Sequence, residues 1–248
     1  SALAPWSLLA ACRTYCKAEH SISVFEGTVN ENQSALSERL ISEKADAIAF
    51  SCYIWNREKI FALCEEIKKS NPGAAIILGG PEVAYCQKEL LENHSFIDFI
   101  LSGEGEITLP RLLDCISEKG DASLLDGVSF LKDNKLTVKN EAIGSHFDYP
   151  SPYCEEYFAS LRGRIAYIES SRGCPFNCAF CLSGKEGKVR FFELSKVKEN
   201  MLSLVNNGAK MDTGNGLFRF VNSNKSIRSY NQVSGSFDVV NVNNGWIN

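Results

Sequence analysis

The chain has 248 residues, a formal net charge of −4, a pI near 5.5 and 44% hydrophobic residues. This acidic balance gives no general attraction to nucleic acid or to an anionic membrane, so we expect neither partner. The longest apolar runs are shorter than the roughly 18 residues that span a bilayer, so we expect no membrane span. Residues 2–12 are apolar, but they follow no Met or basic segment and continue as a helical pattern, which disfavours a signal peptide.

From residue 7 to about 131, short apolar runs alternate with helical patterns, as in a parallel sheet that is covered by helices on both faces. The segment 127–140 alternates about Asp133 and Asn134, which predicts a hairpin. The sequence therefore predicts an α/β domain over residues 1–140. The expected strands are 22–26, 47–51, 74–78 and 98–102, and the expected helices are 7–18, 33–43, 56–70, 83–92 and 106–118.

The second part of the chain begins after a linker at 141–163, which contains Pro150 and Pro152. Residues 164–170 predict a strand, 188–193 predict another, and a helix is expected from an N-cap at Ser195 to about Asn206. These elements define a second domain over residues 164–210. The tail at 211–248 is rich in Asn, Ser and Gly, shows no clear period and is left unassigned.

Three turns follow predicted strands and carry small residues where ligands bind in open parallel sheets, outside the carboxyl strand ends. Glycine lets a large ligand approach the backbone, and a helix that begins behind Gly105 directs free N–H groups toward it. The alternative is that these glycines only form tight turns, and that the acidic residues are first-turn helix residues rather than catalytic acids. The candidates are Ser51, Cys52, Tyr53, Gly79, Gly80, Pro81, Gly103, Glu104, Gly105 and Glu106.

The ten cysteines are too sparse for a secreted disulfide scaffold, which predicts a reducing, cytoplasmic location. Seven are isolated, whereas Cys174, Cys178 and Cys181 share one loop. Cys runs of this kind hold iron–sulfur clusters, and three thiolates would leave one iron of a 4Fe-4S cluster open for chemistry. A structural zinc ion would need a fourth ligand such as Cys154 or His146. A disulfide would leave one cysteine over.

These three cysteines, with Phe180 before the last of them and a strand before the first, resemble the CxxxCxxC motif of radical S-adenosylmethionine (radical SAM) enzymes. The first half is similar to the cobalamin-binding domain that precedes the catalytic barrel in one branch of that superfamily. The resemblance covers residues 1 to about 210. It implies a flavodoxin-like, doubly wound cobalamin-binding domain followed by the start of a radical SAM partial (β/α) barrel.

The resemblance also implies the cofactors and the chemistry. S-adenosyl-L-methionine would chelate the open iron of the 4Fe-4S cluster, and one electron would release a 5′-deoxyadenosyl radical that attacks an unactivated carbon. Cobalamin would face the cluster and carry a methyl group in many relatives. The partners would be a small-molecule substrate and a reductant such as a flavodoxin or ferredoxin. Two alternatives remain: a non-catalytic cobalamin-binding or iron–sulfur electron-transfer module, and a zinc-stabilised interaction protein.

The sequence departs from the resemblance in two respects. It contains no D-x-H-x-x-G loop to supply a His ligand to cobalt, and His20 is interpreted as a surface residue near a helix end. The first strand of a flavodoxin-like order is also missing before the first helix. Residues 165–248 are few for a barrel that takes about 250 residues in its complete form, so we expect no sustained turnover from this chain alone.

Overall fold

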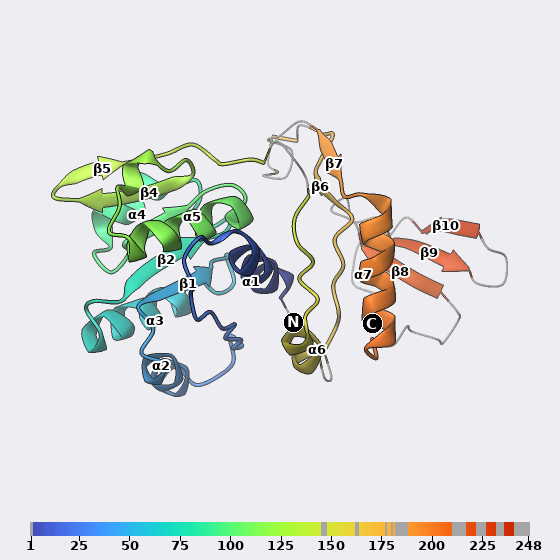
Figure 1. The fold of residues 1–248 in the computed structure, drawn as a ribbon, viewed down its shortest axis with the longest axis horizontal. Coiled ribbons are helices and arrows are strands. Elements are labelled where there is room, and N and C mark those ends of the chain that lie inside the picture. Colours follow the sequence, from blue (N-terminus) through green and yellow to red (C-terminus); the bar gives the residue numbers. More distant parts are fainter. Residues whose placement is uncertain are drawn as a thin grey trace. The chain divides into compact units, whose positions relative to one another are not determined.

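A computed structural model describes residues 2–144, 148–161, 164–176, 178–179, 181 and 188–209, together with the backbones of three strands between 217 and 240. Two compact units are defined by their internal contacts. The first unit is Ala4–Ser145, and the second is His146–Asn248 with Ser1–Leu3. Figure 1 labels the elements along the chain.

The first unit contains a five-stranded sheet in the order β1-β2-β3-β4-β5. The first three strands are parallel, and the last two are antiparallel to their neighbours. Three of the four predicted strands are confirmed within one or two residues. The strands are β1 Ala47–Ser51, β2 Ala75–Gly79, β3 Phe99–Leu101, β4 Val128–Lys132 and β5 Lys135–Thr137.

Helices cover both faces of this sheet, as the alternation of helical patterns and strands predicted (Figure 1). Alternate side chains of β2 point to opposite faces: Ile76 and Leu78 belong to one buried cluster, and Ile77 belongs to the other. The first cluster includes residues of α2, α3 and α4, and the second includes residues of α1 and α5. The helices are α1 Leu3–Tyr15, α2 Gln33–Ser42, α3 Arg57–Ser70, α4 Gln87–Asn93 and α5 Gly105–Ser117, with a 3₁₀ turn η1 at Ala122–Leu124.

The predicted strand at 22–26 is wrong, because this segment has no regular structure. In the described part of the chain, no strand pairs with the backbone of 22–26. Phe25 of this segment still packs against the first cluster. The guanidinium carbon of Arg39 lies over its ring, 4.5 Å from the ring centroid.

The predicted hairpin at 127–140 is confirmed by the pairing of β4 with β5. Asp133 and Asn134 form its turn with φ of 49° and 59°. Positive φ at both central residues matches the right-handed twist of the flanking strands, and Asn and Asp tolerate this conformation better than most residues. The sheet of the first unit therefore ends in a tight antiparallel ribbon.

The second unit contains a short helix, a two-stranded sheet, a longer helix and a three-stranded antiparallel sheet. Tyr157 of the short helix is fully buried and meets the ring of Tyr153 edge to face, with ring centroids 5.1 Å apart. These elements are α6 Glu155–Ser160, β6 Ser171–Gly173, β7 Val189–Phe191, α7 Leu194–Asn206, β8 Leu217–Val221, β9 Ile227–Asn231 and β10 Ser236–Val240.

Two predictions for the second unit are wrong in detail. Residues 164–170 form no strand, and the strand begins only at Ser171, where it pairs antiparallel with β7. The carbonyl of Tyr167 instead accepts a hydrogen bond from the Tyr153 hydroxyl at 2.8 Å. Ser195 is not the N-cap of α7, because the helix begins one residue earlier behind Glu193, and the Ser195 hydroxyl donates to the Glu193 carboxylate.

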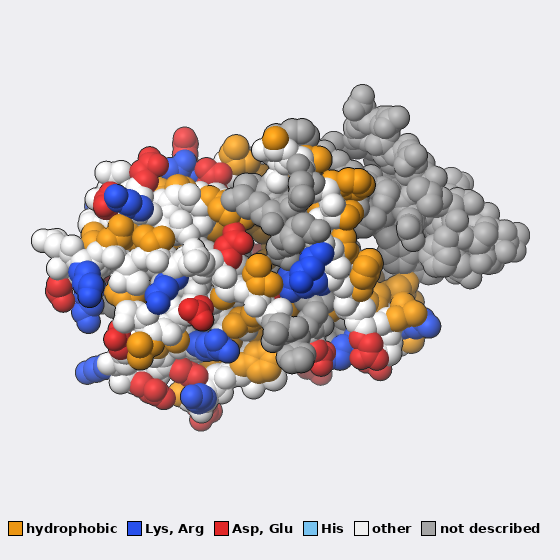
Figure 2. Space-filling view, turned by 90° about the horizontal axis from the view of Figure 1, so that it is seen from above, with side chains coloured by type: hydrophobic (Ala, Val, Ile, Leu, Met, Phe, Trp, Pro, Cys, Tyr) orange, Lys and Arg blue, Asp and Glu red, His pale blue; other side chains and the backbone are white. Residues whose placement is uncertain are grey.

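The surface of the first unit is mixed in charge. On the face shown in Figure 2, Lys and Arg side chains are interspersed with Asp and Glu. No helix in the described part of the chain is both long enough and apolar enough to cross a bilayer.

Candidate functional site

The three predicted turns lie along one edge of the sheet in the first unit. The register of the parallel strands pairs Ser51 with Gly79 and Gly79 with Leu101. The turns that begin at Cys52, Gly80 and Ser102 therefore leave the sheet side by side at its carboxyl edge. This is the edge at which ligands of open α/β sheets bind.

The turn after β1 is held by Asn56, whose side chain donates to the carbonyl of Ser51 at 3.0 Å and accepts from the N–H of Tyr53 at 2.7 Å. The Tyr53 ring stacks on Trp55, with ring centroids 4.7 Å apart and planes 6° apart. Burial raises the pKa of Tyr53. Trp55 is 68% exposed. The sequence analysis did not single out this residue, although the apolar pair Ile54 and Trp55 shortly after a predicted strand was a visible signal.

The turn after β2 packs against the turn after β1. The N–H of Cys52 donates to the carbonyl of Gly79 at 2.7 Å. Gly80 has φ of 106°, and a Cβ atom added to it would lie 2.5 Å from the carbonyl oxygen of Cys52. Pro81 is exposed. Burial, with a smaller contribution from the charge of Glu82, raises the pKa of Cys52 to about 11, so this thiol is protonated and inert near neutral pH.

The turn after β3 is tied to the segment that follows the hairpin. Gly103 has φ of 91°, is exposed, and forms a bridge to Ala142, whose carbonyl oxygen would collide with an added Cβ. Glu104 donates its N–H to Ala142 at 2.8 Å and accepts from the N–H of Gly144 at 2.7 Å. Gly105 begins α5 against Leu8.

Glu104 is the N-cap residue of α5 and Glu106 lies in its first turn, and both are buried. The contacts of Glu104 support the structural interpretation of this residue over a catalytic one. Contact of cobalamin with any of the ten predicted residues stays a prediction.

Beside these turns, an open pocket of about 380 Å³ lies at the start of α4. The adjoining Gln87 donates to the buried hydroxyl of Ser102 at 2.9 Å, and that hydroxyl donates to the carbonyl of Ala84. These bonds fix the start of α4 to the turn after β3. The pocket is lined by Tyr85, Cys86, Gln87, Lys88, Glu89, Glu92, Asn93 and Val138.

The second candidate is the cysteine loop of the second unit. Cys174 directly follows β6, where Gly173 has φ of 86°, and the N–H of Cys181 donates to the carbonyl of Cys178 at 3.0 Å. Cys178 is exposed, the other two are half-buried, and all ten cysteines of the chain are free thiols. Phe180 lies outside the described residues, as does His146, the suggested zinc ligand.

An ion pair braces the base of this loop. Arg172 on β6 donates from Nε and Nη2 to the two carboxylate oxygens of Glu169, each at 2.9 Å. Its guanidinium also lies over the rings of Tyr149 and Phe192, 5.0 and 5.7 Å from their centroids. Bidentate pairing and stacking fix the position of Arg172, two residues before Cys174. Sequence reasoning missed this role of Arg172.

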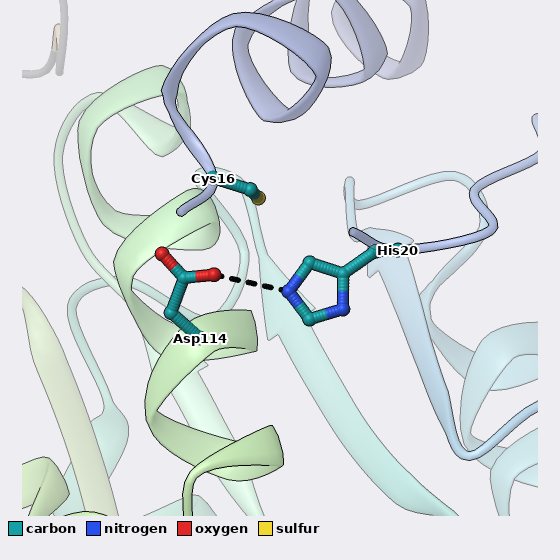
Figure 3. Close-up of side chains that lie close together, drawn as sticks. All are labelled: Cys16, His20 and Asp114. Atoms are coloured by element: carbon teal, nitrogen blue, oxygen red, sulfur yellow. Dashed lines mark hydrogen bonds and ion pairs between the residues drawn. The ribbon is translucent and has the colours of Figure 1, made fainter. Parts of the chain in front are cut away.

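A third group of possible ligands lies within the first unit. Cys16, His20 and Asp114 place one possible metal-binding atom each within 4.8 Å of one another (Figure 3). The interpretation of His20 as a surface residue is wrong, because its ring is half-buried and Nε2 lies 3.0 Å from Oδ1 of Asp114. Among the described residues the loop cysteines form no such group around one point.

Comparison with known proteins gives a class for the first unit. Residues 6–113 match the B12 binding domain family. The solved radical S-adenosylmethionine methyltransferase TsrM from Kitasatospora setae has a TM-score of 0.64 over 84% of this chain and 43% of its own, at 18% identity. The cobalamin-dependent S-adenosylmethionine radical enzyme OxsB has a TM-score of 0.62 over 73% of this chain and 26% of its own, also at 18% identity. At this identity the structures support the fold alone, which is that of an α/β B12-binding domain in the first unit.

Two curated relatives extend the match into the second unit. The cobalamin-dependent radical SAM methyltransferase TokK of Streptomyces tokunonensis is 30% identical over 169 residues, which are 63% of this chain and 25% of TokK. Hopanoid C-3 methylase of Methylococcus capsulatus is 26% identical over 229 residues, which are 87% of this chain and 44% of that enzyme. Residues 6–113 belong to the B12 binding domain family, and the chain is similar to cobalamin-dependent radical SAM methyltransferases. It spans less than half the length of these two relatives.

Proposed function

We propose that the chain is part of a radical SAM enzyme that uses a 4Fe-4S cluster, S-adenosyl-L-methionine and cobalamin, and that transfers a methyl group to an unactivated carbon or carries out related radical chemistry. The observation that carries this proposal is the presence, in one chain, of a B12 binding domain at 6–113 and of three free thiols at CxxxCxxC spacing directly after a strand. The names of TokK and hopanoid C-3 methylase support methyl transfer.

The cysteine loop has the donor set that the cluster needs. Cys174, Cys178 and Cys181 would bind three irons, since thiolates are the usual ligands of iron–sulfur clusters. The fourth iron would be open to S-adenosyl-L-methionine, whose reductive cleavage supplies the radical. The neighbouring Arg172–Glu169 pair would hold the first thiol in position and place a charged, hydrogen-bonded group beside the cluster.

The carboxyl edge of the first unit would hold cobalamin. The exposed ring of Trp55, stacked on Tyr53, offers a flat apolar surface, and the exposed Pro81 and Gly103 leave room for a large ligand to approach the backbone. Because the sequence contains no D-x-H-x-x-G loop, we propose that cobalt has no His ligand from this chain.

The partners and the location follow from the same chemistry. Reduction of a cluster needs a one-electron donor, for which we propose a flavodoxin or ferredoxin, and the substrate would be a small molecule. Ten unpaired cysteines would persist in a reducing compartment, so we propose that the protein is cytoplasmic.

The decisive experiment replaces Cys174, Cys178 and Cys181 together by Ala and measures iron after anaerobic reconstitution. The matched control replaces three half-buried free thiols, Cys86, Cys115 and Cys154, in the same way. We expect four irons per chain and broad visible absorption in the control and neither in the loop variant. Full iron content in the loop variant would refute the assignment, and zinc in place of iron that depends on Cys154 would favour the zinc-stabilised protein.

A second measurement separates a radical SAM site from a plain electron carrier. In the reconstituted chain, S-adenosyl-L-methionine should change the electron paramagnetic resonance spectrum of the reduced cluster, because it binds the open iron. An electron-transfer cluster with every iron ligated by protein would give the same spectrum with and without S-adenosyl-L-methionine.

A further inference from the structure

We propose that Cys16, His20 and Asp114 form a binding site for a divalent transition-metal ion of the zinc type, separate from the two cofactor sites. The three residues come from the segment after α1 and from α5, and Figure 3 shows their side chains converging from these two elements. Thiolate, imidazole and carboxylate are the three ligand types that zinc takes in proteins.

The spacing of the donors suits one ion. Their ligand atoms lie within 4.8 Å of one another, and Nε2 of His20 is 3.0 Å from Oδ1 of Asp114. Ligands at 2.0–2.3 Å around a tetrahedral ion are themselves about 3.3–3.6 Å apart. The site therefore needs a contraction of about 1 Å, within the reach of side-chain rotation, and the nitrogen and oxygen are already at a distance close to that required.

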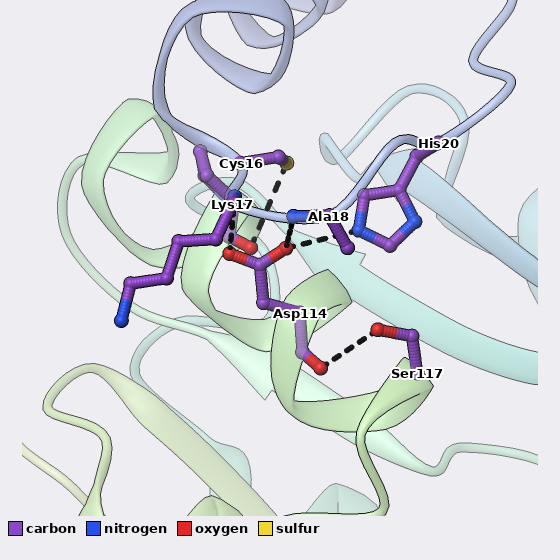
Figure 4. Close-up of polar contacts among 7 residues, drawn as sticks. Cys16, Lys17, Ala18, His20, Asp114 and Ser117 are labelled. Atoms are coloured by element: carbon purple, nitrogen blue, oxygen red, sulfur yellow. Dashed lines mark hydrogen bonds and ion pairs between the residues drawn. The ribbon is translucent and has the colours of Figure 1, made fainter.

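Hydrogen bonds orient the carboxylate before any ion is present. Oδ2 of Asp114 accepts from the N–H of Lys17 at 2.8 Å, and Oδ1 accepts from the N–H of Ala18 at 3.2 Å (Figure 4). An ionised carboxylate has about four lone-pair sites, so a metal can still bind. Such backbone contacts fix a metal-binding carboxylate in place, as partners of ligands commonly do.

Burial permits an ion to enter while limiting competition from water. The side chain of His20 is 18% exposed and that of Asp114 is 10% exposed. The buried thiol of Cys12 lies one helical turn before Cys16 and is a candidate for the fourth position, which water could otherwise fill. Burial and the Asp114 charge raise the pKa of Cys16, so the ion would have to displace its proton.

The site is distinct from the proposed cobalamin edge. α5 begins at the carboxyl edge with Gly105, and Asp114 lies about 14 Å further along the helix, toward the opposite edge. Hydrogen bonds alone would account for the position of Asp114, and the thiol of Cys16 has hydrogen bonds to the carbonyl of Pro110 at 3.7 Å and to the thiol of Cys12. An ion would give all three side chains one role, which is to fix residues 16–20 to α5.

The test uses the full chain with Cys174, Cys178 and Cys181 replaced by Ser, so that the loop cannot bind the ion. After treatment with a chelator, cobalt(II) is titrated anaerobically while the thiolate-to-cobalt charge-transfer absorption is followed, and zinc is then added to displace it. We expect one equivalent of cobalt with charge transfer, displaced by zinc. We also expect zinc at a hundredfold excess over its Kd to raise the Tm by about 5 °C or more.

Single substitutions in that triple-Ser background distinguish a metal site from a group of side chains that are held by hydrogen bonds alone. Cys16→Ser should reduce the charge-transfer absorption at least twofold, because Cys12 is the other thiol that could bind the ion. His20→Gln should weaken cobalt binding at least tenfold and leave the metal-free Tm unchanged, because its amide can keep a hydrogen bond to Asp114. The control Cys115→Ala removes a half-buried thiol next to Asp114 in the sequence, and it should change neither the charge-transfer absorption nor the affinity for cobalt. Absence of cobalt binding, or binding that is unchanged in both Cys16→Ser and His20→Gln, would overturn the proposal.

Discussion

The two adjacent glycines at the carboxyl end of β2 differ in what surrounds them, and this difference predicts opposite effects of the same substitution. A Cβ atom on Gly80 would lie 2.5 Å from the carbonyl oxygen of Cys52, and the φ of Gly80 is 106°. A Cβ atom on Gly79 would have Cβ of Leu101 as its nearest contact, at 3.8 Å, which is an ordinary van der Waals distance. We therefore expect Gly80→Ala to be strongly destabilising and Gly79→Ala to be tolerated.

The magnitude follows from two penalties. A non-glycine residue at positive φ costs about 1–3 kcal/mol, and relief of the clash requires a shift of the backbone where the N–H of Cys52 donates to Gly79 at 2.7 Å. Together these predict a loss of about 2–4 kcal/mol for Gly80→Ala, which would lower the Tm by about 5–15 °C. Gly79→Ala should lie between no change and a gain of about 1 kcal/mol, because Ala restricts the unfolded chain.

Urea unfolding followed by far-ultraviolet circular dichroism measures both variants, and cobalamin titration by absorbance adds a second reading. If cobalamin approaches the backbone at Gly79, Gly79→Ala should weaken its binding at least tenfold at unchanged stability. Equal stability of the two variants would show that the packing argument is wrong. Unchanged cobalamin affinity in Gly79→Ala would remove that glycine from the site.

Three further outcomes are expected. Leu112→Ala should cost about 2–5 kcal/mol in urea unfolding because Leu112 is fully buried, whereas Leu124→Ala, at 79% exposure, should stay within about 0.5 kcal/mol. Burial alone would raise the pKa of Asp114, but hydrogen bonds from the Lys17 N–H, His20 and the Ala18 N–H outweigh it and lower that pKa. Its contribution to stability is therefore present above about pH 4 and lost as pH falls through the lowered pKa, so Asp114→Asn should be less stable than the parent at pH 7 and should converge on it only as pH falls below that lowered pKa. Trp55→Ala should weaken cobalamin binding at least fivefold in an absorbance titration, with little change in Tm because the ring is largely exposed.

The sequence was sufficient to predict the elements that have both a clear local pattern and a pairing partner among the described residues. The run at 47–51 forms β1 at the predicted residues because β2 pairs with it along its whole length. The run at 22–26 also has an apolar pattern typical of a strand but forms none, because strand formation depends on a pairing partner that the local pattern does not reveal. The turn at Asp133 and Asn134 was predictable since its conformation is set by those residues themselves.

Features that depend on long-range contacts could not be predicted. His20 and Asp114 are far apart in sequence, and nothing near His20 indicates that α5 passes beside it. The contacts that Gly80 makes with Cys52 and Gly103 makes with Ala142 are likewise visible only in the fold. By contrast, the cysteine spacing predicted a shared loop directly, because three ligands within eight positions need no tertiary information to be brought near one another.

The packing of the carboxyl edge narrows which predicted residues can recognise a cofactor. Gly80 is required by the protein's own contact with the backbone of Cys52, and Glu104 holds the backbone of Gly144. Their residue types are therefore explained without a ligand. If cobalamin binds here as proposed, it would contact groups at the same edge that remain accessible, chiefly the Trp55 ring stacked on Tyr53 and the exposed backbone around Gly103. An apolar ring and open backbone favour a large, flat ligand held by surface contact and backbone hydrogen bonds.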